Sequence, residues 1–194
     1  SRGLFCNPTL AVTKRVKSGP NFKGGIVSYD KVKNDINKLL YDTSACLVTT
    51  MIDYYGFSAK VPFGNRIQGL SCFQRVDSLE QLFKQDINRS KFLPYLELHE
   101  FEAMVFVSPN EVTDALVKPE KNQLLLDINN QFNSPEEIND NPMTAPSKRL
   151  ETIFPAYKKA LHGPLITKRI GLDNIRRKCT RFDQWIMKLE TLCA

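Results

Sequence analysis

The spacing of apolar residues in the first half of the chain alternates between two patterns. Apolar positions recur at helical spacing over 32–40 and again over 76–87, and each run predicts an amphipathic helix, the first with Asp30 as its cap. The segments 46–52 and 92–98 are rich in apolar and β-branched residues, as is typical of strands buried in a parallel sheet. Helix, strand, helix and strand in this order predict an open, mainly parallel α/β sheet.

The second half of the chain has helical spacing with many interruptions. Seven prolines lie between residues 109 and 164, and because proline ends or kinks a helix, we expect short helices there. His162-Gly163-Pro164 is predicted to end one of them in a turn, and a final amphipathic helix is predicted from about Arg181. We therefore expect one domain over 1–194, in which a helical portion at 99–194 packs on an α/β portion at 1–98.

Composition narrows the class of protein. Hydrophobic residues make up 42% of the chain, and no apolar run approaches the ~18 residues of a membrane span, so no membrane segment is expected. The five cysteines are an odd number without a CxxC pair, which favours reduced thiols and a cytoplasmic protein. The start at Ser1 has neither an initiator Met nor the zones of a signal peptide, and we expect that part of the natural N-terminus precedes it.

Charge is strongly divided along the chain. Ten acidic and two basic residues give 95–143 a net charge of −8, whereas ten basic and two acidic residues give 144–181 a net charge of +8. Such a division is typical either of solvated helix faces or of a cation-binding segment beside a phosphate-binding one.

Carboxylates follow both predicted strands. Asp53 comes directly after the first strand, and the run His99-Glu100-Phe101-Glu102 follows the second. Because parallel strands end on the same edge of a sheet, we expect Asp53 to lie within reach of this run. Oxygen ligands with one imidazole suit Mg²⁺ or Mn²⁺. The alternative is structural: Asp53 caps a turn, Glu100 caps a helix and His99 is a core residue.

A pair of cations begins a predicted helix in the basic segment. Thr144 is expected to cap a helix entered through Pro146, which places Lys148 and Arg149 in its first turn, after Ser147. Cations there oppose the helix dipole and indicate a compensating anion, either a phosphate or the acidic cluster itself. The chain has no GxxxxGK[ST], GxGxxG or GxSxG motif, so common nucleotide-binding folds and serine hydrolases lose their usual signals.

Several segments along the chain carry a family resemblance. They are Phe22-Lys23-Gly24-Gly25 with Ser28-Tyr29, Val48-Thr49-Thr50 through Asp53-Tyr54-Tyr55-Gly56, Leu98-His99-Glu100-Phe101-Glu102-Ala103, Thr144-Ala145-Pro146-Ser147-Lys148-Arg149, His162-Gly163-Pro164 with Ile170-Gly171-Leu172, and Phe182-Asp183-Gln184-Trp185. In this order they resemble the bacterial domain-of-unknown-function family 4276, which is usually regarded as Toprim-like. The resemblance implies a Toprim-like open sheet with flanking helices, in which a glutamate after the first strand and two later aspartates bind Mg²⁺.

The chain departs from that pattern in two places. Asp53 matches the first aspartate, but Tyr55 stands where the second would be, and a phenol does not replace a carboxylate as a hard-metal ligand at neutral pH. The glutamate motif would precede Ser1. Glu100 and Glu102 are therefore the leading substitutes as metal ligands.

Two functions follow from these observations. The first is a metal-dependent nuclease of a bacterial defence or repair system, working beside an ATPase. Asp53, His99, Glu100 and Glu102 would form its catalytic and metal centre with Mg²⁺ or Mn²⁺, Lys148, Arg149 and Lys23 would bind phosphate, and Tyr55, Ser147 and His162 are further candidates. The second is a non-catalytic Toprim-derived module that binds nucleic acid or a partner ATPase, favoured by Tyr55 and the absent glutamate.

Overall fold

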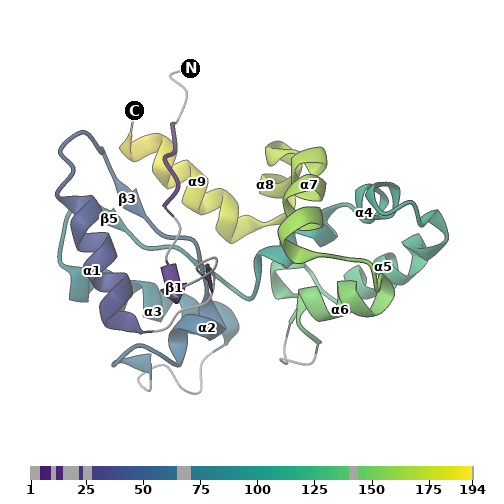
Figure 1. Ribbon diagram of the computed structural model, residues 1–194, viewed down its shortest axis with the longest axis horizontal. Helices are drawn as coiled ribbons and strands as arrows, with labels where there is room; N and C mark the ends of the chain where they lie inside the picture. The colour runs from purple at the N-terminus through teal and green to yellow at the C-terminus, as the bar shows by residue number, and fades with distance from the viewer. Residues whose placement is uncertain are drawn as a thin grey trace. The chain divides into compact units, whose positions relative to one another are not determined.

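The computed structural model describes residues 5–9, 12–14, 22–23, 28–64, 71–139 and 144–193. The chain divides into two compact units, one formed by Ser1–Leu96 with Met187–Ala194 and the other by Glu97–Ile186 (Figure 1). Mixed strands and helices in the first half and helices in the second confirm the α/β class and the helical C-terminal half. Among the described residues, no helix is both long and apolar enough to cross a membrane.

Short strands form the sheet portion of the first unit. β1 (Val12–Lys14) pairs antiparallel with β2 (Phe22–Lys23), and β3 (Val48–Thr49) pairs parallel with β5 (Phe92–Leu93). β4 (Ile52–Asp53) neighbours β6 (Leu96–Glu97), whose first residue belongs to this unit. The parallel pairing was predicted correctly.

The predicted strands 46–52 and 92–98 are each interrupted, the first between β3 and β4 and the second between β5 and β6. Threonine side chains bond backbone groups at these interruptions. Thr50 follows β3 directly, and its hydroxyl both donates to Tyr95 O and accepts from Tyr95 N, each at 3.0 Å. Thr49 Oγ1 donates to Leu93 O at 2.6 Å. Threonine hydroxyls thus replace part of the backbone ladder, which shortens strands that the sequence predicted to be continuous.

Two long helices pack on these strands. α1 (Tyr29–Leu40) contacts β3, and α3 (Cys72–Ile87) contacts β5 (Figure 1). The N-cap of α1 is Ser28, whose side chain accepts the Lys31 N–H; Asp30, which we expected to cap the helix, lies in its first turn. α3 begins with a capping box, because Ser71 Oγ accepts the Gln74 N–H and Gln74 Oε1 accepts the Ser71 N–H.

An aromatic cluster holds this unit together. The rings of Tyr29, Phe57 and Phe83 lie 4.8–5.9 Å apart between centroids, and Phe92 adds an edge-on contact at 5.0 Å to Phe83. Phe57 comes from α2 (Tyr54–Ser58), a short helix at the start of a stretch whose three glycines and one proline before Ser71 are typical of a surface loop. The buried Phe57 explains the difference, because its burial fixes a segment whose glycine and polar residues indicated a loop.

A disulfide joins Cys46, just before β3, to Cys193, at the end of the chain, with their Cα atoms 5.9 Å apart. The expectation that all five cysteines are reduced is therefore wrong for these two. Their separation of 147 residues hides the pairing from the sequence. Cys6 is exposed, Cys72 is half-buried and Cys179 is buried, and all three are free thiols.

Prolines delimit the helices of the second unit, as predicted. Pro109, Pro119, Pro135 and Pro146 each stand in the first turn of an element. The described elements are the 3-10 helix η2 (Phe101–Val107), α4 (Pro109–Ala115), η3 (Pro119–Lys121), α5 (Asn122–Asn129), η4 (Pro135–Glu137), α6 (Pro146–Ile153), α7 (Lys159–Ile170), α8 (Leu172–Lys178) and α9 (Thr180–Leu192). The last begins within a residue of the predicted start.

The prediction that His162-Gly163-Pro164 ends a helix is wrong, since all three residues lie inside α7. Proline is tolerated there because only one hydrogen bond of the helix is lost, and Ile166 and Ile170 bury its apolar face. The helix instead ends at Gly171, whose φ of +80° favours glycine.

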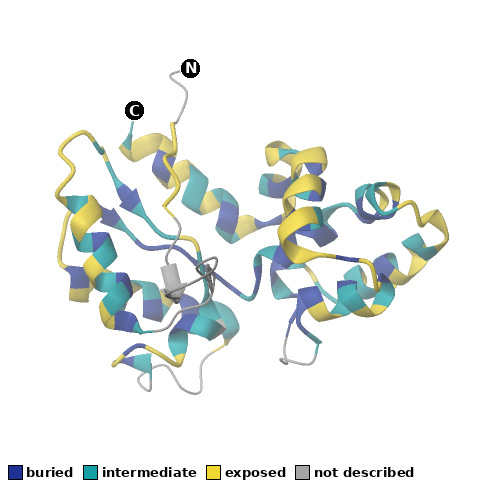
Figure 2. Ribbon diagram, in the orientation of Figure 1, coloured by how far each residue is buried: buried dark blue, intermediate teal, exposed yellow. Residues whose placement is uncertain are grey.

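η2 forms the centre of the second unit. Five consecutive residues from Glu102 to Phe106 are buried (Figure 2). α4, α6, α7, α8 and η4 all contact this helix. A helix covered on every side accommodates a charged residue only beside a partner, and η2 carries one in its first turn.

Candidate functional site

Two glutamates enter the interior of the second unit at the start of η2. Glu100 is its N-cap, with extended backbone angles of φ −139° and ψ 152°, and Glu102 lies in its first turn. Glu100 is only 4% exposed to solvent, and Glu102 only 5%. Buried carboxylates are costly unless they are paired and hydrogen-bonded, so their neighbours decide what the pair does.

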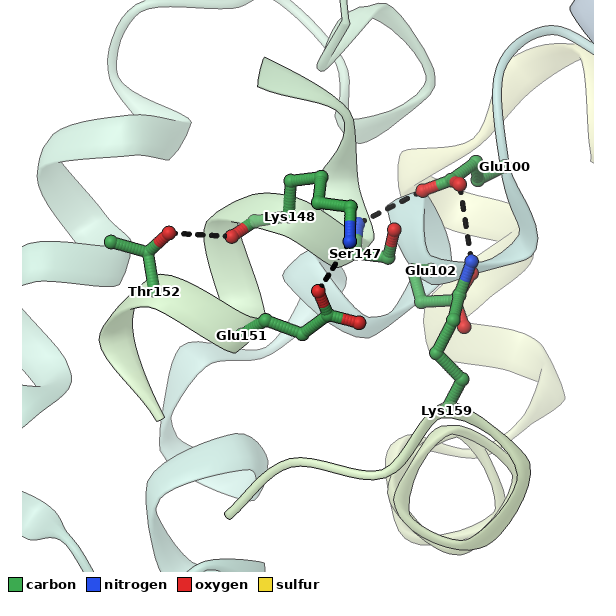
Figure 3. Close-up of polar contacts among 7 residues, drawn as sticks. All are labelled: Glu100, Glu102, Ser147, Lys148, Glu151, Thr152 and Lys159. Carbon is green, nitrogen blue, oxygen red and sulfur yellow. Dashed lines mark hydrogen bonds and ion pairs between the residues drawn. The ribbon is translucent and has the colours of Figure 1, made fainter. Parts of the chain in front are cut away.

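One lysine forms ion pairs with both carboxylates. Lys159, the first residue of α7, places its ammonium 3.1 Å from Glu100 Oε1 and 3.4 Å from Glu102 Oε2 (Figure 3). The Lys159 side chain is 44% exposed to solvent, whereas the side chains of Glu100 and Glu102 are 5% and 7% exposed. We call Glu100, Glu102 and Lys159 the carboxylate–lysine cluster.

The N-terminus of α6 supplies the remaining contact of Glu100. The backbone N–H of Ser147 donates to Glu100 Oε2 at 2.9 Å, and Ser147 itself is buried (Figure 3). A carboxylate at this position is stabilised by the helix dipole as well as by the hydrogen bond. The compensating anion predicted for this helix is thus the acidic run itself, although the N-cap is Ala145 and not Thr144.

The protonation behaviour of the cluster follows from how deeply each group is buried. Burial raises the pKa of Glu102 above its ordinary value of 4.5, a neighbouring Glu100 charge adds to the rise, and Lys159 counteracts only part of it. Lys159 is more exposed. Partial burial lowers its pKa, but the two carboxylates raise it by more, so the pKa of Lys159 lies above its ordinary value. The cluster therefore favours a bound cation over an exposed pair of anions.

Tyr157 adds a polar group that the rest of the site does not use. It is 6% exposed, and its hydroxyl has no hydrogen-bond partner among the described residues. Burial raises its pKa, and the charges of Glu102 and Glu100 raise it further, so the phenol lies in the field of the carboxylates and stays protonated. A Cβ at Gly163 would come 3.3 Å from the Tyr157 oxygen, which shows how closely α7 packs on the phenol.

The basic residues predicted to bind phosphate differ in availability. Lys148 projects from α6 with 58% exposure and pairs with Glu151 at 2.7 Å (Figure 3). Arg149 is half-buried: its Nε donates to Thr144 O at 2.8 Å, and its guanidinium lies 5.6 Å from the ring centre of Phe132. Burial lowers its pKa. Lys148 is therefore the better placed of the two for an external phosphate.

Other predicted site residues lie elsewhere. Asp53 belongs to the first unit, where it ends β4 and is the N-cap residue of α2, without a side-chain capping hydrogen bond. His99 is half-buried directly before Glu100. The shared site of Asp53 with the acidic run stays a prediction. Lys23 lies in β2 and Tyr55 in α2, and the side chains of both fall outside the described residues.

His162 has a local structural role. Its Nδ1 accepts the backbone N–H of Lys158 at 2.8 Å, which satisfies a donor at the start of α7, and its ring lies 5.7 Å from that of Tyr157. Cys179 is not suited to nucleophilic catalysis, because burial and the charges of Glu136 and Glu97 raise its pKa and keep the thiol protonated.

Sequence reasoning found the two carboxylates and missed Lys159 and Tyr157. A weak signal existed, since buried glutamates require a cation and Lys158-Lys159 lies in the strongly basic segment. Nothing in the sequence selects Lys159 over the other lysines there. Its selection depends on the packing of α7 against η2.

The carboxylate oxygens of Glu100 and Glu102 are ligands of the type that a hard divalent cation prefers, but there are few of them. Among the residues that the structure describes, no three His, Cys, Asp or Glu side chains gather to hold a metal ion. However, Mg²⁺ commonly binds through one or two carboxylates and keeps several waters. Glu100 and Glu102 are the residues that would hold such a cation.

Comparison with known proteins gives one family and no named relative. Neither the search of curated proteins nor the search of solved structures found a match. The model of the family described as domain of unknown function (DUF4276) matches residues 1–190. Because this match covers nearly the whole chain, the resemblance inferred from its motifs is confirmed, and the chain belongs to the DUF4276 family.

Proposed function

We propose that the chain is a metal-dependent nuclease that hydrolyses phosphodiester bonds in nucleic acid, as part of a bacterial defence or repair system in the cytoplasm. The observation that carries the proposal is the pair of buried carboxylates, Glu100 and Glu102, gathered around a single ammonium. The same arrangement of acidic oxygens holds a divalent cation in many phosphoryl-transfer sites.

In this proposal each residue has a distinct role. A divalent cation, when bound, supplies Lewis-acid stabilisation of the charge that develops on the phosphate. Glu100 and Glu102 would hold it, and the Ser147 N–H fixes the orientation of Glu100. Lys148, exposed on the same helix as Ser147, would contact a backbone phosphate. A contribution from Asp53, as the resemblance to Toprim-like proteins implies, stays a prediction.

A second candidate is a non-catalytic module that binds nucleic acid or a partner ATPase. One observation favours it: both carboxylate oxygens of Glu100 are already engaged, one by Lys159 and the other by Ser147. A fully paired cluster is also what a structural core requires. The segment 144–181 would then provide a basic docking surface without turnover.

The two candidates differ in what Glu100→Gln does to cleavage. We expect the full-length protein to cleave DNA or RNA in the presence of Mg²⁺ or Mn²⁺, and Glu100→Gln to lower the rate by about 100-fold, because even residues that only orient a metal ligand cost 10- to 100-fold. The measurement is the rate of cleavage of labelled single- and double-stranded substrates, with and without EDTA.

Glu120→Gln is the matched control, because the Glu120 carboxylate is exposed and its pair with Lys118 is long, at 4.0 Å. It should leave cleavage unchanged. Equal cleavage by the Glu100→Gln and Glu120→Gln proteins would reject the carboxylate pair as the catalytic site. Salt-dependent binding of nucleic acid without cleavage would favour the second candidate.

A further inference from the structure

The carboxylate–lysine cluster is not electrically balanced by its own members. Glu100 and Glu102 carry two negative charges when ionised, and Lys159 supplies one positive charge. The Ser147 N–H and the start of α6 offset part of the remainder at Glu100. No comparable backbone donor from another element is described at Glu102, whose described ion pair is the one with Lys159 at 3.4 Å. A doubly charged cation would balance the pair that a single ammonium does not.

Lys159 is also the member that can leave. It is the first residue of α7, so its side chain extends from a helix end, and 44% of it is exposed to solvent. The two carboxylates have 5% and 7% side-chain exposure and are held by the backbone of η2. A lysine on a flexible four-carbon stem reaches water without rearrangement of the helices around it.

Tyr157 adds a second buried polar group beside this cluster, and its hydroxyl has no partner among the described residues. A buried hydroxyl without a partner is costly and rare in folded proteins. A Cβ at Gly163 would lie 3.3 Å from the Tyr157 oxygen and 3.5 Å from the ring of Phe101, the residue between Glu100 and Glu102, so the phenol lies beside the start of η2. Water molecules carried by a hydrated cation would give this hydroxyl a partner.

We propose that Lys159 is a built-in competitor for the divalent cation, so that Glu100 and Glu102 hold either the Lys159 ammonium or the metal. This inference rests on the proposed function, since it assumes that the pair binds a metal. In the metal-free state the Lys159 ammonium pairs with both carboxylates. In the metal-bound state the Lys159 side chain turns to solvent, where its charge faces incoming nucleic acid.

The test follows the exposure of Lys159 directly in the unmodified full-length protein. Brief acetylation with acetic anhydride, followed by mass spectrometry, reports the reactivity of each lysine amine. Upon addition of Mn²⁺ we expect the labelling of Lys159 to rise roughly tenfold, the factor that corresponds to the loss of about 1.4 kcal/mol of ion-pair free energy. Lys148 is the internal reference, because its described ion pair is with Glu151 and involves neither Glu100 nor Glu102.

Sodium chloride at the same ionic strength is the control for screening, and it should change the labelling of both lysines equally. A second readout is the affinity for Mn²⁺: Lys159→Met should bind it more tightly than the wild type. Lys118→Met, at an exposed lysine that pairs with Glu120, should not. If Lys159→Met does not fold, the labelling of the wild-type protein decides.

The outcomes separate this inference from the proposed function. If Mn²⁺ binds in a Glu100-dependent way and the reactivity of Lys159 does not rise, Lys159 is not displaced and only this inference fails. If Mn²⁺ binds neither the wild type nor Lys159→Met, both fail. Binding to Lys159→Met alone, abolished by the further change Glu100→Gln, would support competition in its strongest form.

Discussion

At the scale of single residues, the asymmetry between Glu102 and Lys159 controls the chemistry of the site. Glu102 is buried and Lys159 is half exposed. The pKa of Glu102 is raised because burial outweighs its ion pair with Lys159, whereas the pKa of Lys159 is raised because its two carboxylate partners outweigh its partial burial. The sequence identified Glu100 and Glu102, because carboxylates after a strand end are conspicuous. It did not identify Lys159 or Tyr157, because a partner 55 or more residues away is chosen by packing and not by spacing.

The raised pKa of Glu102 makes stability depend on pH in a definite direction. Between 4.5 and the higher folded-state pKa, the unfolded chain has released the Glu102 proton while the folded chain still holds it, so the free energy of unfolding falls as pH rises. Below 4.5 this contribution is complete. We expect Glu102→Gln to flatten that slope, by at most about 1.4 kcal/mol per pH unit.

The measurement is urea unfolding at a series of pH values in EDTA, with Glu120→Gln as the control. Because other groups also titrate, the informative quantity is the difference in slope between variant and wild type. A Glu102→Gln protein with the same pH dependence as the wild type would show that Glu102 titrates at its ordinary pKa.

At the scale of elements, long helices were predicted more accurately than strands and helix ends. α1 and α3 carry regular apolar stripes, and both were expected from the sequence. The strands are shorter because threonine hydroxyls replace backbone partners, as at Thr50. α7 continues through Pro164 because the burial of Ile166 and Ile170 after the proline compensates for one lost hydrogen bond. Tertiary contacts decide these cases, and spacing along the chain does not record them.

One helix end depends on a distant carboxylate. Glu136, 1% exposed, accepts the backbone N–H groups of Arg181 and Phe182 at 3.0 Å each, and so satisfies two free donors at the start of α9. Glu136→Gln replaces one acceptor oxygen by an NH₂ group that faces an N–H. We expect a loss of about 1–3 kcal/mol in the free energy of unfolding.

Trp185, the single tryptophan, lies in α9 beside Phe182, and its fluorescence during urea unfolding reports this helix. Glu137→Gln is the control, because Glu137 is less buried and makes only longer bonds of 3.2 and 3.4 Å to Asn133. It should change stability by less than about 0.5 kcal/mol. Equal stability of the two variants would mean that Glu136 does not cap α9.

At the scale of the whole molecule, the α/β class and the helical second half were predicted. The two compact units divide between Leu96 and Glu97, inside the predicted strand 92–98 and not after it, where the sequence analysis divided one domain into its two portions. The exact position of the division was not predicted. The Cys46–Cys193 disulfide was also missed, because cysteine spacing carries no information on pairing across 147 residues. In both cases long-range contacts, which leave no local pattern, determine the outcome.

Calorimetric titration of the full-length protein with Mn²⁺ shows whether Glu100 and Glu102 form a divalent-cation site. We expect saturable binding that Glu100→Gln and Glu102→Gln each weaken by about tenfold or more, while Glu120→Gln leaves it unchanged. Saturable binding that is equally strong in the wild type and in both site variants, or no binding at all, would contradict this expectation.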